Sequence, residues 1–147
     1  MKTVLVLSVL ALTFTSSAFA ADVGSDDGDI AAVYIAVPSA KTITKTSGGF
    51  RVFTVAGKTV FVDKTSSGYR MSGEKNSTFI DKSSSGYRVS NGGNATFINK
   101  SASDYRITGR SNTTYISRTS DGYRVSNGKT TDVISKTSDG YRVNSGR

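Results

Sequence analysis

The amino-acid sequence predicts an all-β fold, an antiparallel β-meander built from 18-residue hairpin repeats. Tyrosines recur every 18 residues from Tyr69 to Tyr141, and each is followed by an arginine. Aliphatic residues recur every nine residues from Val62 to Val143. Nine residues suffice for one short strand and one turn, so a fixed period of 18 indicates a hairpin that is stacked on copies of itself.

The segment 77–94 shows the composition of one repeat. Residues 78–82 are rich in β-branched and aromatic side chains, as strands are, and residues 87–90 form a second such run. Serine and glycine between them are typical of a turn. The glycine before each tyrosine fits a turn position with positive φ, and Asp104, which replaces it once, is among the residues that tolerate that conformation.

Pairing Ile80 with Val89 sets the expected register, and we expect the next turn to continue it by pairing Val89 with Ile98. One face of the sheet then carries the aliphatic row beside a row in which cations alternate with tyrosines, while arginines and aromatic residues share the other face. Neighbours across strands are of opposite charge or join a cation to an aromatic ring, which stabilises this register. Two such pairs are Asp81–Arg88 and Lys82–Tyr87.

The repeat extends upstream, so residues 41–147 are expected to form six hairpins, or about twelve short strands. Val52 and Val62 are ten residues apart rather than nine, which predicts a bulge or a longer loop between them. The apolar run 30–37 is expected to add a leading strand. Because open twisted sheets rarely exceed about ten strands, the meander should roll into a curled ribbon or a barrel.

A parallel β-solenoid with 18 residues per coil is the alternative architecture. It would stack identical positions of successive repeats, and lysines and arginines would then lie directly beside their own kind. Like charges on neighbouring strands are destabilising, whereas the antiparallel meander separates them by one strand. We therefore prefer the meander.

Residues 1–20 have the features of a signal peptide. Lys2 precedes an apolar run, and Ala18-Phe19-Ala20 matches the small-x-small cleavage pattern. The run is too short to span a bilayer, so we expect no transmembrane segment. The mature protein is predicted to be secreted, periplasmic or at the cell surface, with an acidic segment at 21–40 and one β domain at 41–147.

The chain carries a formal net charge of +8, and its basic residues are concentrated in the repeats. A basic body is expected to attract polyanions, and acidic polysaccharide, lipopolysaccharide and extracellular nucleic acid are the candidate partners. The acidic counterweight lies at the start, in Asp22, Asp26, Asp27 and Asp29.

The sequence predicts no enzyme activity, no cofactor and no metal site. It contains no histidine and no cysteine, which removes the commonest general base, the commonest nucleophile and the commonest transition-metal ligands. A repeat also distributes side chains evenly instead of converging them in one pocket.

Short strand-turn-strand repeats behind a signal peptide resemble, in style, secreted matrix and adhesion proteins such as curlin. Curlin-type repeats place Gln, Asn and Gly at set positions, whereas this repeat places Lys, Tyr and Arg, and we assign no family. The resemblance implies a structural, surface-matrix or adhesion role. Exposed strand edges would permit self-association, with residues 30–37 as the most adhesive segment. The alternative is a carbohydrate- or polyanion-binding module.

Candidate ligand-binding residues come from the last three repeats. Arg70 and Arg88 face aspartates in the expected register, but the partners of the later arginines carry no charge. Arg110 and Arg147 are expected to add positive potential nearby. With the tyrosine and cation rows of the same repeats, the candidate set is Arg106, Arg124, Arg142, Tyr105, Tyr123, Tyr141, Lys100, Arg118 and Lys136.

Overall fold

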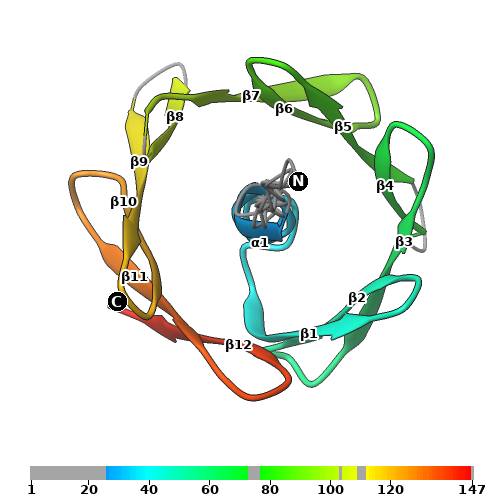
Figure 1. Ribbon diagram of the computed structural model, residues 1–147, viewed down its shortest axis with the longest axis horizontal. Coiled ribbons are helices and arrows are strands. Elements are labelled where there is room, and N and C mark those ends of the chain that lie inside the picture. Colours follow the sequence, from blue (N-terminus) through cyan, green and yellow to red (C-terminus); the bar gives the residue numbers. More distant parts are fainter. Residues whose placement is uncertain (1–25, 73–76, 103, 109–111, 147) are drawn as a thin grey trace, which may run out of the picture.

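A computed structural model describes residues 26–72, 77–102, 104–108 and 112–146 of the chain. These residues form one helix and twelve strands, and the strands close into an antiparallel barrel because β12 pairs with β1 (Figure 1). The elements are α1 (Asp26–Ala36), β1 (Ala40–Thr46), β2 (Gly49–Thr54), β3 (Thr59–Lys64), β4 (Gly68–Met71), β5 (Thr78–Ser83), β6 (Gly86–Asn91), β7 (Asn94–Lys100), β8 (Asp104–Thr108), β9 (Thr113–Thr119), β10 (Gly122–Ser126), β11 (Thr131–Lys136) and β12 (Gly140–Ser145).

The predicted meander is therefore confirmed, and it forms a barrel rather than an open ribbon. Every pairing around the barrel is antiparallel, so the parallel solenoid is wrong. The extra residue between Val52 and Val62 lies in the turn, since the register between β2 and β3 is unbroken. The predicted signal peptide, Arg110 and Arg147 lie outside the described residues.

The register within each hairpin is as predicted, but the register between hairpins is not. Ile80 pairs with Val89, whereas Ile98 pairs with Tyr87 and not with Val89. The same offset of two residues occurs at all six junctions between hairpins, including the one that closes the barrel. A barrel requires such an offset because its strands must tilt in order to close, and a flat meander does not.

The accumulated offset fixes the size of the barrel. Two residues at each of six junctions add up to an offset of twelve residues around the barrel. This sum equals the number of strands, as in other barrels whose strands tilt by about 36°. Twelve strands spaced about 4.8 Å apart at that tilt enclose a backbone cylinder of about 11 Å radius. An α-helix with its side chains is about 10–12 Å across. The interior therefore holds one helix and one layer of inward side chains, and α1 lies at its centre (Figure 1).

The predicted leading strand over residues 30–37 is wrong, because this segment forms most of α1. Ile30, Ala31, Ala32 and Val33 are fully buried, as expected for a helix that is surrounded by protein. Alanine favours the helix, and a closed barrel offers no edge to another strand. The segment expected to be adhesive is thus enclosed, and self-association through strand edges has no basis in the described residues.

The barrel wall adds two kinds of side chain to the core. Because of the offset, an aromatic ring lies beside an aliphatic side chain across each junction, as Tyr87 lies beside Ile98. The predicted nine-residue row is buried throughout, in Ile43, Val52, Val62, Met71, Ile80, Val89, Ile98, Ile107, Ile116, Val125, Ile134 and Val143.

The glycine before the tyrosine is required by backbone geometry. Gly86 has a φ of 138°, and a Cβ there would lie 1.9 Å from the carbonyl oxygen of Ile98 on the neighbouring strand. Gly68 and Gly122 are in the same situation. No described residue other than glycine has a positive φ, so the expectation that Asp104 adopts this conformation is wrong.

Gly86→Ala is expected to destabilise the barrel by at least about 2 kcal/mol, because the β6–β7 contact must open to admit the methyl group. Gly48→Ala is the matched control, since a Cβ there meets nothing within 4 Å. Urea unfolding monitored by circular dichroism gives both free energies. Equal effects of the two substitutions would contradict the close approach described for Gly86.

Candidate functional site

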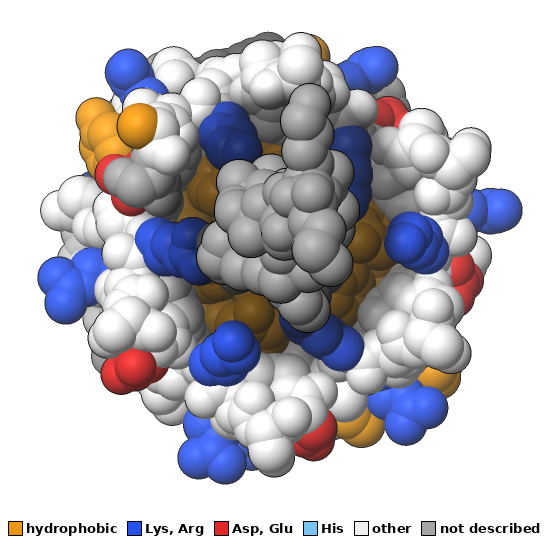
Figure 2. All heavy atoms as spheres, viewed as in Figure 1, with side chains coloured by type: hydrophobic (Ala, Val, Ile, Leu, Met, Phe, Trp, Pro, Cys, Tyr) orange, Lys and Arg blue, Asp and Glu red, His pale blue; other side chains and the backbone are white. Residues whose placement is uncertain are grey.

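Six cations occupy equivalent positions, each two residues after the buried aliphatic residue of the first strand of a hairpin. Each pairs with the aromatic residue of its own hairpin, as Lys82 pairs with Tyr87. Figure 2 shows Lys and Arg side chains set around the mouth of the barrel. We refer to this set as the rim cations: Lys45, Lys64, Lys82, Lys100, Arg118 and Lys136.

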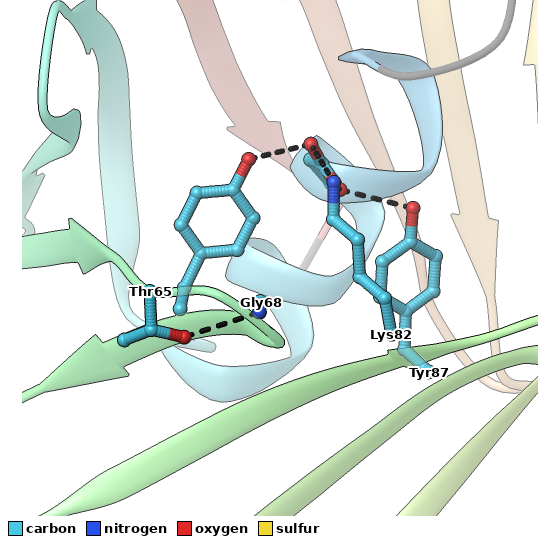
Figure 3. A network of polar contacts seen from close by, with 6 residues as sticks. Thr65, Gly68, Lys82 and Tyr87 are labelled. Atoms are coloured by element: carbon cyan, nitrogen blue, oxygen red, sulfur yellow. Dashed lines mark hydrogen bonds and ion pairs between the residues drawn. The ribbon is translucent and has the colours of Figure 1, made fainter.

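One rim cation binds a carboxylate of the central helix. Asp29, in α1, is 1% exposed, and the Lys82 Nζ lies 2.8 Å from each of its two oxygens. The phenol of Tyr69 donates to Asp29 Oδ2 at 2.6 Å, and that of Tyr87 donates to Oδ1 at 3.0 Å. Figure 3 shows Lys82 and Tyr87 reaching from the wall toward α1. One cation and two phenols thus compensate a buried charge, as burial requires.

Close contact between α1 and this wall depends on Gly28. A Cβ there would lie 2.4 Å from the hydroxyl oxygens of both Tyr87 and Tyr105. Burial, and then the Asp29 carboxylate, raise the pKa of Tyr87 far above its ordinary value. The Tyr87 phenol therefore remains a hydrogen-bond donor to Asp29 across the physiological pH range.

A second polar contact holds α1 from the other side. The Tyr34 hydroxyl donates to Asp132 Oδ2 in β11, and β11 lies six strands from β5 around the twelve-stranded barrel. The helix is therefore joined to two opposite walls, to β4, β5 and β6 through Asp29 and to β11 through Tyr34.

The predicted ligand-binding residues lie in three separate places. The three arginines are exposed on the outer wall, the rim cations Lys100, Arg118 and Lys136 are exposed at the mouth, and the three tyrosines are buried inside the barrel. The structure does not bring the nine residues into one site. A site on the outer wall cannot include Tyr105, Tyr123 or Tyr141. Alternate residues of a strand face opposite sides of the sheet, and these three side chains face the interior of the barrel.

On the outer wall each arginine faces one residue within its own hairpin and another residue across the junction to the next hairpin. Arg106 faces Asn99 within its hairpin and Tyr115 across the junction. Its guanidinium carbon lies 6.0 Å from the centre of the Tyr115 ring, and that of Arg51 lies 5.6 Å from the Phe61 ring. Phe61 and Tyr115 are 56% and 51% exposed. Arg51 and Arg106 therefore lie beside open aromatic rings, whereas Arg124 and Arg142 face Val133 and Thr42 across their junctions.

Barrel closure changes which arginines are neighbours. Arg70 and Arg88 face Asp63 and Asp81, but four arginines face uncharged residues within their hairpins. These four lie on consecutive hairpins around the closed barrel. We call them the outer arginine arc: Arg106, Arg124, Arg142 and Arg51.

Sequence reasoning missed Arg51, Asp29 and Asp132. Arg51 is at the opposite end of the repeat region from Arg142, and only the pairing of β1 with β12 brings them onto neighbouring hairpins. Asp132 could have been identified from the sequence as a departure from the repeat, because the equivalent positions are threonine in the three preceding repeats. Asp29 lies outside the repeat, and nothing in its neighbours along the chain distinguishes it from Asp26 or Asp27.

No protein-family model, curated protein or solved structure matches this chain. Within the residues that the structure describes, no group of three or more His, Cys, Asp or Glu side chains is placed to hold a metal ion. The described part of the chain also contains no helix with the length and apolarity needed to cross a membrane.

Asp29→Asn should lower the free energy of unfolding by about 2 kcal/mol, because Lys82 and two phenols lose the charge that they surround. Asp63→Asn, on the exposed outer wall, should change it by less than about 0.5 kcal/mol. Urea unfolding of both variants tests the difference. A cost for Asp29→Asn no larger than that of the control would show that the buried contact does not stabilise the fold.

The raised pKa of Tyr87 predicts a loss of stability in alkaline solution. Below the ordinary tyrosine pKa of 10.0, the residue is protonated in both the folded and unfolded states. Above it, only the unfolded state releases the proton, so the free energy of unfolding falls as the pH rises. The slope measures the number of protons released on unfolding, and Tyr87→Phe should reduce that number by about one. Urea unfolding at several pH values above 10.0 gives the slope, and an unchanged slope would contradict the effect.

Proposed function

We propose that the protein is exported and acts without catalysis as an adhesion module that binds acidic polysaccharides on its outer wall. The observation that supports this function is the outer arginine arc, in which four arginines that face uncharged residues within their hairpins lie on consecutive hairpins. Figure 2 also shows Lys and Arg side chains on the outer circumference of the barrel. Repetition at a fixed spacing suits a polymer, since linked weak contacts reinforce one another.

The chemistry of the arc favours a sugar acid over other anions. A guanidinium group pairs with carboxylate or sulfate in two-point geometry. Beside it, the exposed rings of Phe61 and Tyr115 offer apolar surface to the C–H face of a sugar. An exported protein meets acidic polysaccharides outside the cell, and attachment to them is one form of the adhesion role that the repeats imply.

Retention on immobilised polygalacturonate tests the arc with matched double variants. Arg106→Gln/Arg124→Gln should elute at lower salt than Arg70→Gln/Arg88→Gln, because each arginine of the second pair faces an aspartate across its hairpin, whose negative charge lowers the positive potential there. Each lost contact should lower the slope of log affinity against log salt by up to about one unit. Circular dichroism checks that all variants are folded.

Arg51→Gln/Arg142→Gln extends the test to the closed topology. These arginines lie at opposite ends of the repeat region, and this double variant should lose as much retention as Arg106→Gln/Arg124→Gln. Equal losses from the two arc pairs and from the Arg70/Arg88 pair, which faces aspartates, would overturn the arc as the binding surface. Stronger retention on single-stranded DNA than on polygalacturonate at equal ionic strength would overturn the choice of ligand.

A further inference from the structure

A cavity of about 420 Å³ lies at the end of the barrel opposite the rim cations. It is bounded by the end of α1, by the segment that joins α1 to β1, and by strands β3, β4, β5 and β6. The volume falls within the range of small-molecule sites, which runs from about 300 to about 1,000 Å³. The described residues that line it include none of the rim cations and no member of the outer arginine arc.

The lining of the cavity contains residues in which the wall departs from its repeat. Met71 is the one methionine among the twelve buried positions of the nine-residue row, where every other residue is isoleucine or valine. Val60 stands where β5, β7 and β9 carry threonine and β11 carries aspartate. The turn between β2 and β3, which contributes Lys58 to the lining, holds the extra residue of the repeat region. One part of a repetitive wall is therefore chemically distinct, and it faces the cavity.

The position of α1 explains why this space is open. Gly28 and Asp29, at the start of the helix, lie close to β5 and β6. Near the end of the helix, Tyr34 donates a hydrogen bond to Asp132 in β11, on the opposite wall. Asp132 occupies the position in its repeat that Thr78 occupies on β5, so the Tyr34 contact and the cavity lie at the same level of the barrel. The helix fills the β11 side of this layer, and the cavity is the space on the other side.

The polar groups of the lining suit a hydroxyl group. Thr78 is 6% exposed, and its Oγ1 accepts a hydrogen bond from the Asn91 side-chain amide at 2.9 Å. This is the one hydrogen bond that either side chain makes with a described residue. The Thr78 hydroxyl therefore keeps a proton to donate, and the Asn91 carbonyl oxygen keeps its capacity to accept. A ligand hydroxyl can accept from the first and donate to the second, whereas a carboxylate can only accept.

The apolar groups of the lining favour an aromatic ring. Val37 and Met71 are 7% and 5% exposed, and Pro38 and Val60 add to the same apolar lining. A thioether adapts to the shape of a ring, and contact between its sulfur and the ring edge is favourable. Among the described residues no carboxylate lines the cavity, so a cationic ligand would find no partner of opposite charge there.

We infer that this cavity binds a small uncharged aromatic molecule that carries a hydroxyl group. The ring lies against Met71, and the hydroxyl group lies between Thr78 and Asn91. Such a ligand uses both the donor and the acceptor that the wall presents, and it buries its apolar surface against the residues that depart from the repeat. The site goes beyond the proposed function and does not depend on it, because the outer wall contributes no residue to the binding groups.

The test is a titration of the full chain with p-cresol, which is uncharged at neutral pH, followed by the methyl resonance of Met71. The chain has two methionines, so selective methyl labelling gives a simple spectrum, and Met71→Leu assigns the resonance. A bound aromatic ring shifts it by the ring current. Toluene, which lacks the hydroxyl group, should bind about tenfold more weakly, because it displaces water from Thr78 and Asn91 without replacing the hydrogen bonds.

Thr78→Val removes the hydroxyl group and keeps the branched shape of the side chain. It should weaken the binding of p-cresol about fivefold and leave that of toluene within about twofold, since only p-cresol uses the lost donor. Thr114→Val, at the equivalent position on β9 and outside the lining of the cavity, is the matched control. It should change neither affinity by more than about twofold.

A Met71 methyl resonance that does not move with p-cresol would overturn the inference, as would equal affinities for p-cresol and toluene. Equal weakening of both ligands by Thr78→Val would overturn the hydroxyl contact, because a change in the shape of the cavity affects both alike. Should Thr78→Val fail to fold, Asn91→Ala, at an exposed position, takes its place with the same expectation.

Discussion

The enclosed volume of a twelve-stranded barrel is the constraint on which the rest of this structure depends. Each junction between hairpins is offset by two residues, and this offset sets both the tilt and the radius of the wall. One layer of inward side chains cannot fill the resulting cylinder, and an empty apolar interior would forfeit the packing that stabilises it. The α1 helix supplies the missing volume. Its apolar sequence, its helical conformation and its burial all follow from that requirement.

Much of the wall could be predicted from the sequence, whereas its contents could not. The positions of the strands and the pairing within each hairpin follow from local alternation and turn residues, which act over a few residues. The offset between hairpins is a property of the closed sheet, so the predicted Val89–Ile98 pair was wrong even though both residues are inward and buried. The segment 30–37 reads as a strand by its apolar composition alone. Its helical form is decided by the cylinder that surrounds it, and this is information that no short window of sequence contains.

The central helix also breaks the sixfold repetition of the wall. Equivalent rim positions carry nearly the same chemistry, yet one carboxylate can lie against only one part of the rim, and Asp29 lies between β4 and β6. Lys82 therefore stabilises the fold by binding this buried carboxylate. Lys136 and Lys45 line a cavity on the opposite part of the rim. Repeated residues therefore need not share a role, because the Asp29 carboxylate of the single non-repetitive element binds one of the rim copies, Lys82. For the same reason, the candidate cations Lys100 and Lys136 cannot be ranked by the repeat pattern alone.

Closure has a parallel effect on the outer wall. In a linear array the first and last repeats are the most distant, and the charge of one contributes little to the other beyond a Debye length of about 10 Å. In the barrel β1 pairs with β12, so Arg51 lies on the hairpin next to that of Arg142. The arginines that face an aspartate are then Arg70 and Arg88, on two adjacent hairpins, and the arginines of the remaining four hairpins form the arc. A surface that sequence order places in the last three repeats therefore extends across the chain's own starting strand, and its extent is determined by the pairing that closes the sheet.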